Sequence, residues 1–120
     1  MPETLADRLR AAAGRIRDHF GRGQLHDEAG NVCAIGAILD ARSPDAKVIS
    51  IYSDVVADNA LTELHLYLIE QHRIGAIDLA RAGHSFRVDA ITMWNDLVVR
   101  DGDEAATVME KAAARWEERA

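Results

Sequence analysis

The clearest helical pattern in the chain lies in residues 5–20, LADRLRAAAGRIRDHF. Its apolar side chains recur at spacings of three and four residues, which places them on one face of an α-helix: Leu5, Leu9, Ala12, Ile16 and Phe20. Thr4 is well placed to cap the start of this helix, and Gly21 and Gly23 are expected to end it. The pattern therefore predicts an amphipathic helix with one buried face.

Further helices are predicted along the chain, separated by residues that break helices. They cover residues 32–42, 54–71, 74–82, 86–96 and 105–118. Polar residues at or near the start of three of these ranges are the expected N-terminal caps. They are Ser53 or Asp54, Ser85, and Asp101, which begins a segment with the spacing of a capping box, Asp101-Gly102-Asp103-Glu104. Ala90, Met93, Trp94 and Leu97 are expected to face the core.

Two segments have no clear helical pattern. Residues 24–31 are predicted to form a loop that turns at Gly30, with at most a short strand leading into it. Residues 47–52 fit either a strand or a buried helical turn, because six apolar-rich residues do not separate the two. The sequence thus predicts an all-α or α-rich single domain, residues 1–120, of five to six helices with at most one short strand or hairpin.

Composition supports this fold class and excludes several others. The 120 residues are 48% hydrophobic and 28% charged with two prolines, unlike a disordered or collagen-like chain. Aromatic residues make up 5% and 21 residues are alanine, which favours packed helices over sheets. No segment approaches the ~18 apolar residues of a membrane span, and the N-terminus does not resemble a secretory signal. The single cysteine indicates a reducing, cytoplasmic setting.

Charge is distributed unevenly along the chain. Residues 1–23 carry five arginines and three acidic residues, whereas residues 24–120 have an excess of eight acidic side chains, giving a net charge of −6. An acidic body repels phosphate backbones, so general nucleic-acid binding is not expected. The N-terminal arginines fit either the solvated face of an amphipathic helix or a local patch for an acidic partner.

Two short blocks contain the scarce residues of the chain. One runs from Asp27 through Gly30, Cys33 and Gly36 to Ala37, and the other is Trp94-Asn95-Asp96. They resemble an uncharacterised family of small actinobacterial and actinophage proteins, with the pattern Asp-x-x-Gly, Cys-x-x-Gly-Ala, Trp-Asn-Asp and a terminal helix. The resemblance implies a small intracellular protein, bacterial or phage-encoded, and carries no established activity.

The first block and the residue before it contain the side-chain types that a cysteine nucleophile needs: a cysteine, a histidine and an aspartate. Cys33 is expected near a helix start, where backbone N–H groups stabilise a thiolate, and His26 and Asp27 would supply a base and an orienting group. The alternative is a small buried hydrophobic residue, which is the commoner role of a lone cysteine.

Both blocks also have a structural interpretation, and the second has a binding interpretation as well. Gly36 and Ala37 form a helix face of little bulk that is expected to pack closely, against Trp94. Asn95 and Asp96 either fix a helix end by hydrogen bonds to the backbone or, with Trp94, recognise a base-like ligand. The candidate ligand or interaction residues are Asp27, Gly30, Cys33, Gly36, Trp94, Asn95 and Asp96.

No cofactor or metal is predicted. His65 and His72 lie two helical turns, about 10 Å, apart, which is too far for one zinc ion. The chain also lacks a His-Glu-x-x-His pattern and a glycine-rich phosphate loop.

Three functions remain open from the sequence. The leading hypothesis is a non-enzymatic interaction protein whose helical surface binds a host partner or a second copy, because apolar residues such as Leu66, Tyr67 and Ile69 cover several sides of one helix. The alternative is a protein that sequesters a small acidic ligand or signalling nucleotide in a cleft between the two blocks. The third is an enzyme that depends on Cys33.

Overall fold

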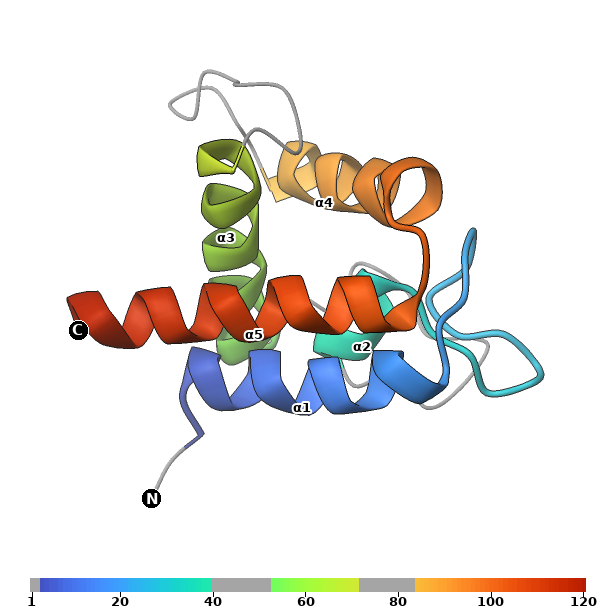
Figure 1. The fold of residues 1–120 in the computed structure, drawn as a ribbon, viewed down its shortest axis with the longest axis horizontal. Coiled ribbons are helices and arrows are strands. Elements are labelled where there is room, and N and C mark those ends of the chain that lie inside the picture. Colours follow the sequence, from blue (N-terminus) through green and yellow to red (C-terminus); the bar gives the residue numbers. More distant parts are fainter. Residues whose placement is uncertain (1–2, 40–52, 72–83) are drawn as a thin grey trace.

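The computed structural model describes residues 3–39, 53–71 and 84–120. These residues form five α-helices and one π-helical turn (Figure 1). In chain order the elements are α1 (Leu5–Asp18), α2 (Ala34–Leu39), α3 (Val55–Glu70), α4 (His84–Met93), η2 (Trp94–Val98) and α5 (Gly102–Arg119). The all-α prediction is confirmed for the described residues, in which β-pairing is limited to two isolated bridges.

The first and last helices form the central pair of the fold. α1 and α5 lie side by side and run in opposite directions, and α3 crosses them at a steep angle (Figure 1). The buried face of each helix is rich in small side chains, which lets two helices approach closely; it comprises Ala6, Leu9, Ala12, Ala13 and Ile16 on α1 and Ala105, Ala106, Val108, Met109, Ala112 and Ala113 on α5. The many alanines of the chain therefore serve as packing surface.

Ion pairs run along this pair of helices. Arg10 bonds to Glu117 (2.9 Å), and Arg17 bonds to Asp103 (3.2 Å) and Glu110 (2.6 Å). Residues 10 and 17 thus meet residues from opposite ends of α5, as an antiparallel pair requires. Arg10 and Arg17 therefore lie on an exposed face of α1, as the amphipathic-helix interpretation predicts, and carboxylates of α5 neutralise both charges.

The predicted caps are mostly confirmed. Thr4 and Asp7 form a reciprocal capping box at α1, Asp54 caps α3, and the Asp101 carboxylate accepts from the Glu104 N–H at α5. The prediction for Ser85 is wrong, because α4 begins one residue earlier, at His84, and Ser85 lies inside it.

Several predicted boundaries change. α1 ends at Asp18, so Phe20 lies beyond the helix and forms an isolated parallel bridge with Val32. The helix predicted over 32–42 is observed as α2, Ala34–Leu39, and its last three predicted residues lie outside the described part of the chain. The predictions for residues 47–52 and 74–82 also fall outside it.

The turn that follows α4, η2, departs from α-helical geometry. The Val99 N–H donates to the Trp94 carbonyl (3.0 Å), five residues back, as in a π-helix. The buried face of α4 passes through Val88, Ile91 and Trp94, which leaves Met93 on the opposite side. The expectation that Met93 and Leu97 face the core is therefore wrong: their side chains are 59% and 76% exposed.

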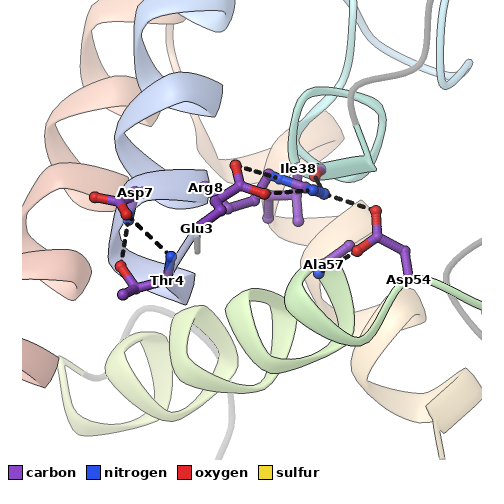
Figure 2. Close-up of polar contacts among 7 residues, drawn as sticks. All are labelled: Glu3, Thr4, Asp7, Arg8, Ile38, Asp54 and Ala57. Atoms are coloured by element: carbon purple, nitrogen blue, oxygen red, sulfur yellow. Dashed lines mark hydrogen bonds and ion pairs between the residues drawn. The ribbon is translucent and has the colours of Figure 1, made fainter. Parts of the chain in front are cut away.

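Arg8 connects three helices through one side chain. Its guanidinium donates to both carboxylate oxygens of Glu3, to the Ile38 carbonyl (3.0 Å) at the end of α2, and to Asp54 Oδ2 (2.8 Å) at the start of α3 (Figure 2). The side chain is only 15% exposed, and these acceptors hold the pKa of Arg8 above its usual range, with Glu3 as the largest cause. Arg8 thus fixes the relative positions of α1, α2 and α3.

Candidate functional site

The two sequence blocks meet where the loop after α1 reaches η2. Asn95 is fully buried there and uses its whole amide. Its Oδ1 accepts from the N–H of Ala34 (2.9 Å), the first residue of α2, and its Nδ2 donates to the Gly21 carbonyl (3.1 Å). The first N–H groups of any helix have no hydrogen-bond partner within the helix. The Asn95 amide satisfies one of them at the start of α2, although the two residues are 61 positions apart in sequence.

Asp96 continues the same connection. Its Oδ1 accepts from the Gly23 N–H (3.2 Å) and from Asn95 Nδ2 (2.9 Å). We call these contacts of Asn95 and Asp96 with Gly21, Gly23 and Ala34 the clasp. Of the two interpretations of Asn95 and Asp96, the hydrogen bonds support the structural one, since most of their polar atoms bind the backbone of this chain.

Trp94 is part of the core and takes no part in the clasp. Its side chain is fully buried, and in the described part of the chain its indole N–H has no hydrogen-bond partner. An indole enclosed in this way presents no face to a ligand. The geometry favours Trp94 as a packing residue.

Gly36 is a packing residue as well, and the backbone of Leu25 lies directly against it. A Cβ atom built on Gly36 would lie 1.8 Å from the Leu25 carbonyl oxygen and 2.7 Å from the Leu25 carbonyl carbon. Any side chain at this position would therefore collide with the backbone of the loop. The small-residue face of α2 thus lets the loop of residues 24–31 lie directly on the helix, and the expected contact of this face with Trp94 stays a prediction.

Asp27 and Gly30 build the turn within that loop. The Asp27 carboxylate accepts from the N–H groups of Ala29 and Asn31, both at 2.9 Å, and these bonds hold its pKa below the usual range, with that from Asn31 as the largest cause. Gly30 has φ +88°, a conformation that side chains disfavour, and its N–H donates to the Asp27 carbonyl. The predicted turn at Gly30 is confirmed.

Cys33 has the environment of a buried thiol. It is 4% exposed, its Sγ accepts a weak hydrogen bond from the Gly36 N–H (3.4 Å), and burial is the main cause that raises its pKa, with the Asp96 charge adding to the effect. A nucleophile needs the opposite shift, because the thiolate is the reactive form. In the described residues no hydrogen bond joins Cys33 to His26 or Asp27, and the buried Nδ1 of His26 has no partner. The geometry favours the structural role of Cys33.

A small hollow opens beside the clasp. It has a volume of about 190 Å³ and is lined by Gly23, Gln24, Leu25, Cys33, Thr92 and Asp96. It brings together Cys33 and Asp96 from the two blocks, but not Asp27, Gly30 or Trp94. The volume is below the ~300–1,000 Å³ of typical ligand pockets.

The N-terminal arginines do not line this hollow. Arg22 is the nearest in sequence, and its guanidinium lies 4.6 Å from the centre of the Phe20 ring and donates to the Val99 carbonyl (2.7 Å). No positive charge from residues 1–23 is thus available there to attract an acidic ligand.

Comparison with known proteins gives a family and no activity. A family of unknown function, DUF6197, matches residues 1–115, which include every described element except the end of α5. The chain belongs to DUF6197. None of the curated proteins and none of the solved structures compared with this DUF6197 member matches it. The motifs of the resemblance, and its actinobacterial and phage range, stay predictions.

One surface feature of this DUF6197 chain was not predicted. Met93, Leu97 and Val98 are 59%, 76% and 47% exposed, and the π-turn brings them to one side, because residues four and five positions apart are neighbours on a π-helix. We call these three side chains the apolar face. Periodicity placed Met93 and Leu97 on one face of the predicted helix but assigned that face to the core, and the structure exposes it.

Other kinds of site find no support in the described part of the DUF6197 chain. Residues 3–39, 53–71 and 84–120 contain no group of three His, Cys, Asp or Glu side chains placed to hold a metal ion. Within these same ranges no helix has the length and hydropathy to cross a bilayer.

Proposed function

We propose that this DUF6197 member is a non-enzymatic interaction protein that binds a partner protein through the apolar face. The observation that carries the proposal is the exposure of three large apolar side chains at one helix end, Met93, Leu97 and Val98. Scattered single apolar residues are normal on a protein surface, but three adjacent ones indicate a surface that another molecule covers.

The clasp supports this proposal by fixing the helix that carries the face. Asn95 and Asp96 lie between Met93 and Leu97, and they tie η2 to α2 and to the loop after α1. Contact residues on a rigid element lose little conformational freedom on binding, which favours affinity. The π-turn is a second argument for a functional role of this helix end, since such turns occur frequently at functional sites.

Photo-cross-linking inside the native cells tests the proposal. A photoreactive amino acid replaces Leu97 in one variant and Val55, which is 71% exposed at the start of α3, in the control. We expect a defined cross-linked protein, identified by mass spectrometry, at position 97 and not at 55. Identical products or no products at the two positions would contradict the proposal, whereas a second copy as the product would identify self-association.

A second candidate function is the binding of a small ligand in the hollow beside the clasp. The observation that favours it is the meeting of the Cys33 thiol, the Asp96 carboxylate and Thr92 around one cavity of about 190 Å³. This volume admits only molecules smaller than a nucleotide. Thermal shift with nucleotides and with small polar metabolites at millimolar concentration is the test, and no stabilisation by any of them would remove this candidate.

The remaining expectations from the sequence stay part of the proposal. An intracellular, cytoplasmic setting and a bacterial or phage source agree with the single cysteine and with the resemblance. Enzymatic use of Cys33 receives no support from its burial or its raised pKa.

A further inference from the structure

The clasp uses only one of the two carboxylate oxygens of Asp96. Oδ1 accepts from the Gly23 N–H (3.2 Å) and from Asn95 Nδ2 (2.9 Å). Among residues 3–39, 53–71 and 84–120, no donor lies within hydrogen-bond distance of Oδ2. Asp96 is partly buried and lines the hollow of about 190 Å³ beside the clasp. The clasp thus fixes a carboxylate in the wall of this hollow through one of its two oxygens.

The Asp96 carboxylate brings a negative charge to a wall that is otherwise neutral. The other residues that line the hollow are Gly23, Gln24, Leu25, Cys33 and Thr92. Two nearby arginines point elsewhere: Arg22 donates to the carbonyls of Val99 (2.7 Å) and Arg100 (3.4 Å), and the charge of Arg87 acts on the buried His65 of α3. In the described part of the chain, the wall of the hollow therefore carries one negative charge and no positive one.

The backbone next to the hollow gives an anion little support. Cys33 leads into α2, and N–H groups at the start of a helix can bind anions. Three of those at the start of α2 already have acceptors in this chain, namely Asn95 Oδ1 for Ala34, Cys33 Sγ for Gly36 and the Cys33 carbonyl for Ala37. The Gly23 N–H is likewise occupied, by Asp96. An anion in the hollow would meet a carboxylate and find these four donors in use.

We propose that the hollow binds a small primary amine in its alkylammonium form. This inference rests on the second candidate function, the binding of a small ligand beside the clasp, and adds the chemical class of that ligand. The ammonium group donates to Asp96 Oδ2, and such a bond between two charged groups is stronger than a neutral one. The Thr92 hydroxyl and the Gln24 amide are the neutral acceptors for its remaining N–H groups, and the alkyl chain packs on Leu25 and Cys33.

The volume of the hollow limits the length of the amine. A water molecule takes about 30 Å³ of liquid, so a hollow of about 190 Å³ holds roughly six non-hydrogen atoms. n-Butylammonium, which has a chain of four carbon atoms, is within this limit. A ligand of so few atoms makes few contacts, and we therefore expect a dissociation constant in the millimolar range.

The test adds three probes of similar size to the full chain: n-butylammonium, 1-butanol and butyrate. Binding is followed by the NMR shifts of the Gly23 and Cys33 amides at constant ionic strength, with sodium chloride as the reference for general salt effects. We expect saturable shifts with butylammonium at millimolar concentration and at least about tenfold weaker binding of the other two probes. Higher salt should weaken the binding of butylammonium, because screening reduces its attraction to the carboxylate.

Three variants separate the charge of the hollow from its space. D96N keeps an Oδ1 acceptor for the Gly23 N–H and for Asn95 but removes the charge, so it should weaken butylammonium binding by about tenfold or more. T92L fills the hollow with a larger side chain and should weaken butylammonium binding to a similar extent. D18N removes an exposed carboxylate at the end of α1, which does not line the hollow, and is the matched control that should bind like the wild-type chain.

Each other outcome has a definite meaning. If butanol or butyrate binds as well as butylammonium, or if D96N binds butylammonium like the wild type, the ammonium inference is overturned and the small-ligand function stands. Butylammonium binding that T92L leaves unchanged would lie outside the hollow and would overturn the inference too. If no probe binds, the inference also falls, and the thermal-shift screen then decides the small-ligand function by itself.

Two features keep these results separable. Should D96N fail to fold, the comparison of the three probes on the wild-type chain and on T92L still decides between an ammonium site and none. Cross-linking at position 97 tests the apolar face, which shares no residue with the hollow, so its result does not depend on any of these titrations.

Discussion

Asn95 shows how one buried side chain can hold two distant segments. Its amide satisfies the Ala34 N–H and the Gly21 carbonyl, and in the absence of the amide both groups are left without a partner. Each buried polar group that loses its partner costs about 1–3 kcal/mol.

The first prediction follows from those two bonds. Asn95→Ala should lower the free energy of unfolding by about 2–4 kcal/mol, measured by urea denaturation. Asn59→Ala, at an exposed position of α3, is the control and should change stability by less than about 0.5 kcal/mol. Equal stability of the two variants would mean that water replaces the clasp at little cost.

The second prediction compares two glycines inside helices. Gly36→Ala should destabilise the protein strongly, because its Cβ would lie 1.8 Å from the Leu25 carbonyl oxygen. Gly14→Ala on α1 meets nothing within 4 Å and should stabilise the protein by about 0.5–1 kcal/mol through helix propensity. Thermal melts of both variants check the opposite signs, and a shift in the same direction would contradict the close approach at Gly36.

The third prediction concerns pH and Cys33. Burial raises the pKa of its thiol above the usual 9.0, so the unfolded chain loses this proton at lower pH than the folded chain. The stabilising contribution is complete below pH 9 and is lost as pH rises through the folded value. Urea midpoints of the wild type should therefore fall more steeply above pH 9 than those of Cys33→Ala, and parallel curves would contradict a buried neutral thiol.

At the scale of elements, the sequence predicted where the helices lie better than it predicted the residues at which they end and the faces that they bury. Thr4, Asp54 and Asp101 were found because capping depends on nearest neighbours in sequence. The outward position of Met93 and Leu97 was missed because the buried face of α4 passes through Val88, Ile91 and Trp94, and the local pattern does not show which apolar stripe of the helix meets the core. The bonds of Asn95 depend on tertiary contacts, so its residue type was recognised while its partners were not.

The fourth prediction concerns the link that Arg8 makes between helices. Arg8→Ala should lower the free energy of unfolding by roughly 2–3 kcal/mol, because the Ile38 carbonyl and Asp54 lose a largely buried charged donor. Arg10→Ala removes an exposed pair with Glu117 and should cost at most about 1 kcal/mol. Chemical denaturation of both variants checks the difference, and equal losses would mean that Arg8 acts only as a surface ion pair.

At the scale of the molecule, the two ends of the chain share one core. α1 and α5 pack together and α3 packs against both, so the buried faces of these three helices form one core. The sequence predicted the helix content of this arrangement. It did not predict the pairing of α1 with α5, since both faces are alanine-rich and equally compatible with other neighbours.

The fifth prediction follows from the shared core. Thermal unfolding should be a single transition, with the same midpoint by far-UV circular dichroism and by tryptophan fluorescence. Trp116→Phe leaves the fully buried Trp94 as the one indole of the chain. The fluorescence of Trp94 should then change with the same midpoint as the circular dichroism signal. A separate early change in either signal would show that part of the helical assembly unfolds independently.

The antiparallel arrangement of α1 and α5 also determines how the fold responds to force. Leu5 and Arg119 lie at the same end of the pair, next to the Arg10–Glu117 bond (Figure 1). A pull on these two residues loads that bond first, and the bonds of Arg17 to Glu110 and Asp103 follow in sequence. α5 would therefore peel from α1 turn by turn at low force, whereas a parallel pair would have to slide all its contacts at once.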